Sequence, residues 1–427
     1  MTKFLLSAFF LFPILVLAQN YTTYFTGNTT DLVTNPNGGI CLMGGATEDD
    51  NAMKWFLERA NGGDILVLRA TGSNGYNSYL YTGLGINVNS VETIVCNNTA
   101  ASSDPYVLQK IQQAEAIWFA GGDQWTYITY WRNTPLEQAI NDAINQRNIV
   151  IGGTSAGMAI QGKYYFSAQN GTVTSSAALS NPYNNQMTVD SIHFIENSYV
   201  NNVITDTHFD NPDRKGRLIT FLARINSDFG QLANAIACDE YTAVCIDTNG
   251  LARVFGGFPA YDDNAYFIQS NCELGNPQPE NCTNGNTLTW DLGGQALKVY
   301  QIKGDATGSK TFDLTDWKTG VGGTWFNWSS SNGVFNEAIG SPLNCEHVSV
   351  DDLSNNLEVT IFPNPFTNFI NVSNKKGNEQ SILLNYCGQV IWSGKNIEQT
   401  DFSFIPNGIY FLQVKNQTIK VVKQENE

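Results

Sequence analysis

The feature that most constrains the fold is a regular alternation of short apolar runs and amphipathic stretches between Gly39 and Gly153. The apolar runs have the length of buried strands. The predicted strands are Ile40 to Met43, Asp64 to Arg69, Val91 to Cys96, Ala116 to Ala120 and Ile149 to Ile151.

Helices are predicted between these strands, over Asp49 to Ala60 and Leu136 to Gln146. In the first, apolar residues such as Met53, Phe56 and Leu57 recur at three- and four-residue steps, as a helix packed on a sheet requires. The succession of strand, helix and strand predicts an α/β fold whose mainly parallel sheet carries helices on both faces. Sites in such folds lie beyond the carboxyl ends of the strands.

The section from Gly250 to Leu343 is rich in Gly, Asn, Thr and aromatic residues. Strand-like pieces at Ala296 to Ile302 and Gly323 to Trp328 indicate strands and long loops that complete the main domain. We therefore expect one main domain over residues 19–344, with a β-rich carboxyl-terminal extension.

The amino terminus has the pattern of a secretory signal peptide over residues 1–18. Lys3 precedes an apolar run from Phe4 to Leu17, and the small residue Ala18 marks the expected cleavage point. A membrane anchor is the weaker alternative, because the run is short and contains Pro13. The chain is therefore expected to be exported.

Composition narrows the classes of partner and cofactor. With 39 acidic and 23 basic residues the formal charge is -16, which repels phosphate backbones and argues against nucleic acid as a partner. The histidines are His193, His208 and His347, and no CxxC or HExxH motif occurs, so neither a metal nor another cofactor is expected. Export permits disulfides, and Cys272 with Cys282 is the simplest pair to consider, although spacing does not fix connectivity.

The carboxyl-terminal part forms a separate section. Residues 345–356 are polar and are predicted to be a linker, and residues 357–427 contain evenly spaced apolar segments that predict a small β-sandwich. These segments are LEVTIFPNPFTNFINV, SILLNYCGQVIW, TDFSFI and GIYFLQV. The Pro-Asn-Pro and Pro-Asn-Gly-Ile-Tyr elements and the terminal Lys-Val-Val-Lys resemble the sorting domain of type IX secretion cargo. A carbohydrate-binding or adhesive module is the alternative.

The segment IVIGGTSAGMAI carries the clearest chemistry. Gly153 to Gly157 fits G-x-S-x-G, a strand–turn–helix elbow that exposes the hydroxyl of Ser155 above the sheet. The glycines suit a strained nucleophile whose neighbours approach closely. An ordinary Gly-rich turn is the alternative.

A serine nucleophile needs a base and an acid. His208 opens a polar loop after a strand-like run and is favoured over His193, which lies in an apolar stretch. Asp239 and Glu240 end the apolar run NAIACDE, so one of these two acids is expected to face the site, unless both simply face water.

Backbone donors for a tetrahedral intermediate are also expected. Gly121 and Gly122 end another strand in IWFAGGDQ, where small residues let N–H groups approach an oxyanion, and the amide of Ala156 follows the nucleophile. A plain strand-to-helix turn is the alternative.

The ordered segments FAGGDQ, GGTSAG, DTHF with RKGRL, and ACDEYTA resemble the motifs of cyanophycinase-like serine peptidases, a family that includes aspartyl dipeptidases. The resemblance runs from about Ile40 to Asp247 and implies the class I glutamine amidotransferase-like α/β fold. It implies Ser155 as nucleophile, His208 as base and Glu240 as acid. It also implies an oxyanion site at Gly122, Asp123 and Ala156, and a substrate side at Gln124, Asp206, Arg214 and Arg217.

The resemblance implies a secreted serine peptidase that cleaves aspartyl or β-aspartyl bonds through an acyl-enzyme, with cyanophycin a candidate substrate. The chain departs from cyanophycinases at Thr207, where they have Gln, and at Pro212, where they have Arg, and Asp210 and Asp213 add negative charge nearby. These departures predict weaker recognition of cyanophycin. The alternatives are an inactive surface binding or adhesion protein, or an amidase or glutaminase, on the same fold. The expected partners are an aspartate-containing peptide and the type IX machinery, with a homodimer as a candidate assembly.

Overall fold

The computed structural model describes residues 19–192, 194–344, 360–373, 380–385, 389–414 and 417–424. These residues fall into two compact units, and the boundary between them lies between residues 345 and 346. Each unit is described by itself. The predicted signal peptide (1–18), the predicted linker (345–356), His193 and His347 lie outside the described residues.

The main sheet of the first unit has ten strands in the order β1-β4-β3-β5-β6-β2-β11-β12-β15-β16. Strands β4, β3, β5, β6 and β2 run parallel, and the flanking strands pair antiparallel. The bounds are β1 Thr22–Gly27, β2 Ile40–Met43, β3 Asp64–Arg69, β4 Ser90–Val95, β5 Ala116–Phe119, β6 Val150–Thr154, β11 Ala243–Ile246, β12 Leu251–Phe255, β15 Thr311–Asp313 and β16 Gly320–Val321. All five predicted strands are therefore present, with ends that differ by up to three residues.

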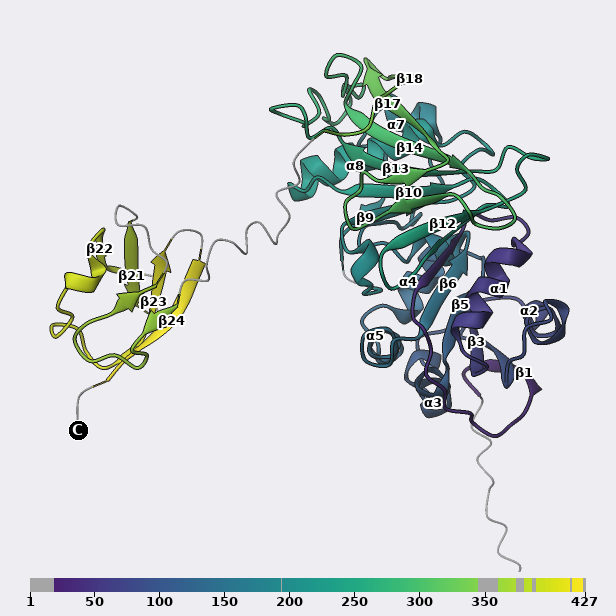
Figure 1. Cartoon of the computed structure of the whole chain (residues 1–427), viewed down its shortest axis with the longest axis horizontal. Coiled ribbons are helices and arrows are strands. Elements are labelled where there is room, and N and C mark those ends of the chain that lie inside the picture. The colour runs from purple at the N-terminus through teal and green to yellow at the C-terminus, as the bar shows by residue number, and fades with distance from the viewer. Residues whose placement is uncertain are drawn as a thin grey trace, which may run out of the picture. The chain divides into compact units, whose positions relative to one another are not determined.

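Helices cover both faces of this sheet (Figure 1). They are α1 Asp50–Arg59, α2 Gly75–Ser78, α3 Pro105–Gln113, α4 Gln124–Trp131 and α5 Pro135–Arg147. Along β3, Leu66 and Leu68 pack in the core with α3 and α5, whereas Ile65 and Val67 pack with α1. The two predicted helices correspond to α1 and α5; α3 and α4 were not anticipated.

A second sheet has six strands in the order β18-β17-β14-β13-β10-β9. Its strands are β9 Val203–Asp206, β10 Asn234–Cys238, β13 Asn264–Ser270, β14 Leu297–Lys303, β17 Thr324–Ser331 and β18 Val334–Ile339. Only β9 and β10 are parallel; the other pairs are antiparallel. Helices α7 Ser175–Ser180 and α8 Lys215–Phe229 share a buried core with this sheet. The section after Gly250 thus extends the main sheet and also builds most of a second one.

The remaining elements of the first unit are short. A two-stranded sheet joins β7 Tyr165–Phe166 to β8 Val189–Asp190, and helical turns lie at Tyr79–Gly83, Ala101–Ser103 and Ser198–Val200. Among the described residues, no helix combines the length and apolar character needed to cross a membrane.

The second unit contains a four-stranded antiparallel sheet, β22-β21-β23-β24, and a two-stranded sheet, β19-β20. Their bounds are β19 Ile361–Phe362, β20 Asn371–Val372, β21 Ser381–Asn385, β22 Val390–Gly394, β23 Gly408–Val414 and β24 Gln417–Lys423, with a helical turn at Ile397–Gln399. The segment TDFSFI is not a strand; it is irregular and turn-like, although Phe402 and Ile405 are buried in the core. The expected fold class, a mainly parallel α/β sheet followed by a small antiparallel β unit, is confirmed.

The pairing considered for Cys272 and Cys282 is wrong. Cys272 is disulfide-bonded, whereas Cys282 is a free thiol.

Candidate active site

Ser155 lies in a sharp turn between β6 and the short helix α6 (Ala156–Ala159). Its backbone has φ 52° and ψ -115°, a conformation that residues other than glycine rarely adopt. The Ser155 N–H donates to the carbonyl of Met43 on β2 at 3.1 Å. The turn therefore has the strained strand-to-helix geometry expected of a nucleophile elbow.

The glycines of this turn allow α6 to lie directly on the sheet. A Cβ on Gly157 would overlap the carbonyl oxygen of Phe119 on β5, and a Cβ on Gly153 would lie 2.6 Å from the Gly157 carbonyl carbon. Side chains at either position would push α6 away from the sheet, so the G-x-S-x-G pattern has a direct steric cause.

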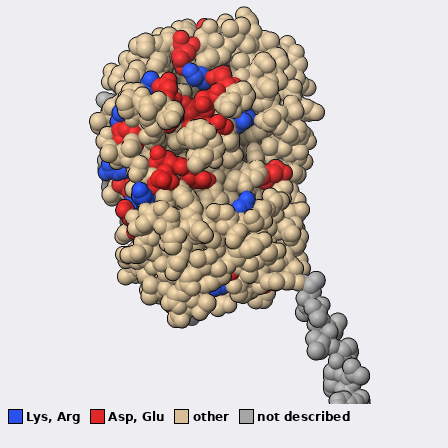
Figure 2. All heavy atoms as spheres, turned by 90° about the vertical axis from the view of Figure 1, so that its right-hand side faces the viewer, with Lys and Arg blue, Asp and Glu red and all other residues tan. Residues whose placement is uncertain are grey.

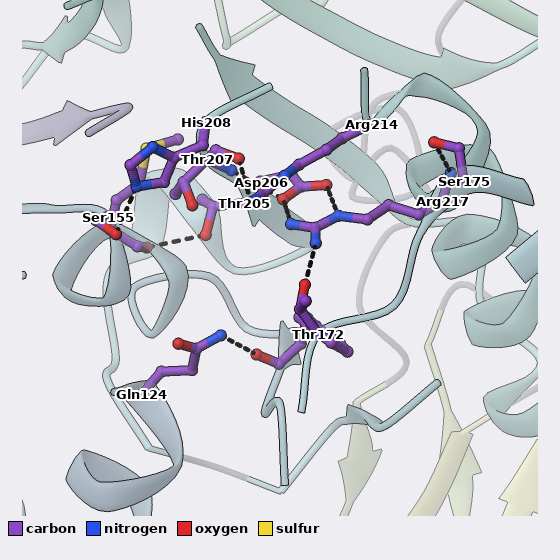
Figure 3. Close-up of polar contacts among 12 residues, drawn as sticks. Gln124, Ser155, Thr172, Ser175, Thr205, Asp206, Thr207, His208, Arg214 and Arg217 are labelled. Carbon is purple, nitrogen blue, oxygen red and sulfur yellow. Dashed lines mark hydrogen bonds and ion pairs between the residues drawn. The ribbon is translucent and has the colours of Figure 1, made fainter. Parts of the chain in front are cut away.

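His208 follows β9 and faces Ser155 (Figure 3). Its Nε2 lies 2.8 Å from Ser155 Oγ, and its Nδ1 lies 2.6 Å from Glu240 Oε1. The His208 N–H donates to the carbonyl of Gly44 at 2.8 Å, and the imidazole packs so closely on Gly45 that a Cβ there would overlap the ring. The loop after β2 therefore fixes both the backbone and the ring of His208.

Glu240 follows β10, the parallel neighbour of β9. The carboxyl ends of these two strands lie side by side, which brings Glu240 to His208. The hydrogen bond from His208, opposed in part by burial, lowers the pKa of Glu240 below its usual value. Two residues hold Glu240 in place that sequence analysis did not assign to the site, although Asp210 was noted as a nearby negative charge. Asp210 Oδ1 accepts the Glu240 N–H at 2.9 Å, and Asn211 Nδ2 donates to Glu240 Oε2 at 3.4 Å. Their position directly after His208 was the only available signal.

Asp239 contacts Asn264 instead of the imidazole. Its Oδ2 accepts from the Asn264 N–H at 3.0 Å and from Asn264 Nδ2 at 2.9 Å. Burial raises the pKa of Asp239 to about 7. Of the two acids left open by the sequence, Glu240 is the one that the structure brings to His208.

A cavity of about 250 Å³ opens beside Ser155 and His208. It includes all four residues expected on the substrate side, Gln124, Asp206, Arg214 and Arg217. Its other lining residues are Ser155, Ala156, Ala159, Phe166, Ala168, Thr172, Thr205, Thr207 and His208. Pro212 is exposed and is not among these lining residues.

The two arginines of the cavity differ in what holds them (Figure 3). Arg217 forms a two-point ion pair with Asp206, with Nε 2.9 Å from Oδ2 and Nη2 bonded to Oδ1, and both side chains are 3% exposed. Its Nη1 also donates to Thr172 Oγ1 at 3.2 Å.

Arg214 has no carboxylate partner within hydrogen-bonding distance among the described residues, and its side chain donates to the carbonyl of Thr207 at 2.8 Å. Burial is the larger cause and the nearby charge of Arg217 the smaller; together they lower the pKa of the Arg214 guanidinium to about 10. Arg214 is therefore the cation of this cavity that can still receive an anion.

Of the three predicted oxyanion residues, Ala156 lines the cavity, whereas Gly122 and Asp123 do not. Ala156 lines the cavity at the start of α6, where N–H groups lack intrahelical partners. Gly122 and Asp123 lie exposed in the turn before α4, outside the cavity lining, and Asp123 caps α4 by accepting the N–H of Trp125 at 3.0 Å. Gly121 is close to the nucleophile, since a Cβ there would lie 3.7 Å from Ser155 Cβ.

Charge on one face of the first unit is predominantly negative. Figure 2 shows acidic side chains gathered on this face, with basic side chains scattered among them.

Within the described ranges, no group of three or more His, Cys, Asp or Glu side chains is arranged to hold a metal ion.

Comparison with known families identifies both parts of the chain. Residues 73–252 match the model of peptidase family S51, and residues 360–424 match the secretion system C-terminal sorting domain. The resemblances inferred from the motifs are confirmed: the chain carries a peptidase S51 domain homologous to cyanophycinases and a type IX sorting domain. The S51 match supports a peptidase hydrolase, and the sorting domain supports secretion and a cell-surface location.

Individual relatives are distant. The chain is 24% identical over 236 residues to a cyanophycinase of Synechococcus elongatus, covering 53% of this chain and 68% of the relative. It is 26% identical over 150 residues to a cyanophycinase of Trichormus variabilis, covering 35% and 45%. Among solved structures it resembles a peptidase from an acI-B1 Actinobacterium, with 16% identity, a TM-score of 0.39, and coverage of 54% of this chain and 91% of that one.

Proposed function

We propose that this chain is an exported serine peptidase that hydrolyses aspartyl or β-aspartyl peptide bonds through an acyl-enzyme. The observation that carries the proposal is the hydrogen-bonded row, or triad, of Ser155, His208 and Glu240. His208 Nε2 lies 2.8 Å from Ser155 Oγ, and His208 Nδ1 lies 2.6 Å from Glu240 Oε1. A nucleophile, a base and an acid that orients the base are the groups required for acyl transfer. The match to peptidase family S51 supports the same reaction class.

Each residue of the row then has one task. His208 Nε2 takes the proton of Ser155 Oγ as this oxygen attacks the scissile carbonyl carbon, and Glu240 stabilises the imidazolium through Nδ1. The Ala156 N–H, with a backbone donor at Gly121 or Gly122, binds the oxyanion. Collapse of the intermediate breaks the C–N bond and gives the His208 proton to the leaving amine. Water, deprotonated by His208, then releases the acyl group and restores Ser155.

The cavity beside Ser155 supports an acidic side chain in the substrate. Asp206 neutralises Arg217, whereas Arg214 retains N–H donors for a carboxylate. Phe166 and Ala168 line the same cavity, whose volume of about 250 Å³ can hold a short aspartyl group. Cyanophycin, the polymer for which the relatives are named, is a candidate substrate, and Thr207 in place of glutamine is the departure that lines the cavity.

We also propose that residues 1–18 direct export across the inner membrane and that residues 357–427 direct type IX delivery. The sorting-domain match over residues 360–424 supports this route.

Labelling with a serine-reactive fluorophosphonate probe tests the mechanism. The wild type should be labelled, and Ser155→Ala should lose labelling and at least about 10³-fold of hydrolysis while keeping its Tm. Ser103→Ala is the control, because Ser103 is exposed and lies outside the cavity lining. A labelled Ser155→Ala, or one with near-normal turnover, would contradict the assignment.

Substrate choice is tested by giving the purified enzyme cyanophycin, short aspartyl and β-aspartyl peptides, and glutamine. Cleavage of the short peptides supports the proposal. Rapid release of β-Asp-Arg from cyanophycin with the peptides untouched would make the enzyme a cyanophycinase, and ammonia release from glutamine alone would make it an amidase. A wild type that is neither labelled nor active would indicate a binding protein.

A further inference from the structure

Two buried cysteines face each other beside the proposed active site. Cys41 on β2 and Cys245 on β11 are directly opposite in the antiparallel register, and their Sγ atoms are 3.6 Å apart. Both residues are fully buried in the core under α1. In the structure both are free thiols, and their sulfur atoms are in van der Waals contact.

The pair occupies the type of cross-strand position that a disulfide can bridge. At the end of β2, the Gly44 N–H donates to the carbonyl of Thr242 at 2.9 Å, which marks a hydrogen-bonded pair. Bonded and non-bonded pairs alternate along an antiparallel ladder, so Cys41 and Cys245, three positions away, form a non-bonded pair. The Cα atoms of such pairs are about 4.5 Å apart, within the range of about 4.4–6.8 Å found in disulfides.

The destination of the protein favours oxidation of this pair. The sorting domain supports secretion, and Cys272 of the same unit is disulfide-bonded. Disulfides form and persist in such exported proteins. We propose that Cys41 and Cys245 are joined by a disulfide bond in the secreted protein.

The bond would form by thiol–disulfide exchange with an oxidised protein dithiol, such as a disulfide oxidoreductase of the cell envelope. The thiolate of one cysteine attacks the oxidant's disulfide and forms a mixed disulfide; the thiolate of the second cysteine then attacks the protein sulfur of this mixed disulfide and displaces the oxidant's thiolate. Two protons leave the cysteines, one S–S bond forms between them, and the two electrons reduce the oxidant to a dithiol. Burial raises the pKa of the Cys245 thiol well above its usual value, so exchange belongs to the folding chain and not to the folded protein.

The bond would join two strands whose ends lie next to the proposed catalytic residues. At the end of β2, Met43 accepts the Ser155 N–H and Gly44 accepts the His208 N–H. Strand β11 begins at Ala243, three residues after Glu240. A covalent link between these strands would limit how far the acid can move from the nucleophile and the base.

Peptide mapping of the secreted protein tests the proposal. The protein is denatured without reductant, alkylated with N-ethylmaleimide and digested. Cys96, Cys238 and Cys282 are free thiols and serve as internal controls that should carry the label. Cys41 and Cys245 should be unlabelled, should occur in one cross-linked peptide, and should become labelled only after reduction. Labelling of both before reduction, or a cross-link from either to another cysteine, would overturn the proposal.

Thermal unfolding gives a second measurement. The Tm of Cys41→Ala/Cys245→Ala should be lower than that of the wild type by roughly 5 °C without reductant, and the gap should shrink when reductant is present. Cys238→Ala removes another fully buried thiol and should leave the effect of reductant unchanged. Reduction of Cys272 affects all variants alike, so an equal effect of reductant on the wild type and the double variant would contradict the bond.

Discussion

At the scale of single residues, the two arginines of one sequence motif have different surroundings. Arg217 is 3% exposed and bonded at two points to Asp206, whereas Arg214 donates to a backbone carbonyl. The family resemblance placed both on the substrate side, and both line the cavity. It could not show which of them already had a carboxylate partner, because that depends on contacts between β9 and α8.

Matched substitutions should separate the two roles. Arg214→Gln should leave the Tm nearly unchanged and lower kcat/KM for an aspartyl peptide by about 10- to 100-fold, because a carboxylate loses its charged partner. The loss should be smaller for the corresponding asparaginyl peptide. Arg217→Gln should instead lower the free energy of unfolding by about 3–5 kcal/mol, because Asp206 remains buried without its partner. Thermal unfolding and steady-state kinetics of both variants check this; the opposite pattern would reverse the assignment.

Asp239 gives a pH dependence of stability. Burial raises its pKa in the folded protein to about 7 from 3.8, so between these values the folded state holds a proton that the unfolded state has lost. Stability should therefore fall as the pH rises from about 4 to 7, by at most about 4 kcal/mol from this group.

Asp239→Asn should remove that fall. The amide oxygen can keep the bonds from Asn264, and no charge has to be buried at pH 8. The Tm of the variant minus that of the wild type should increase from pH 5 to pH 8. A constant difference across this range would show that Asp239 does not titrate as its burial indicates.

At the scale of elements, sequence patterns succeeded where a segment is buried on both sides. The five apolar runs became strands because a parallel sheet covered on two faces needs continuous apolar residues. Helix α4, QWTYITYW, was missed because aromatic and β-branched residues favour strands. The Asp123 cap and the burial of Tyr127, Ile128 and Trp131 override that preference. The segment TDFSFI failed in the opposite way, since its apolar residues are in the core without forming a strand.

The contact between α6 and the sheet can be tested with a glycine substitution. Gly157→Ala should lower both the Tm and kcat/KM, the latter by at least about 10-fold, because a Cβ there overlaps Phe119 and displaces the turn that holds Ser155. Gly75→Ala in α2 is the matched control. A Cβ at Gly75 meets no atom within 4 Å, so the Tm should stay the same or rise slightly. Equal behaviour of the two variants would argue against a tight elbow.

At the scale of the whole molecule, the division into two units follows from separate hydrophobic cores. The buried apolar side chains between residues 360 and 424 form a separate hydrophobic core. The sequence anticipated this division, because turn spacing and apolar patterns change after residue 344. It did not anticipate the second sheet of the first unit, because the pairing of β10 with β13 and of β14 with β17 joins segments that local patterns cannot relate.

Removing the residues after Asp351 should therefore leave a soluble, active enzyme that is not delivered to the surface or medium. Each unit has its own core, so the catalytic unit should fold alone. Activity of the purified truncation and its distribution among cell fractions are the measurements, with full-length Ser155→Ala as a control that should be delivered normally. Loss of activity, or normal delivery of the truncated chain, would contradict the separation of roles.

The proposed nucleophile belongs to the ten-stranded sheet, whereas the base and the acid belong to the six-stranded sheet. Neither sheet alone holds a complete set of reacting groups. A chain in which only one of the two sheets has formed would therefore lack hydrolytic activity. Activity would arise only after both sheets have formed and packed together.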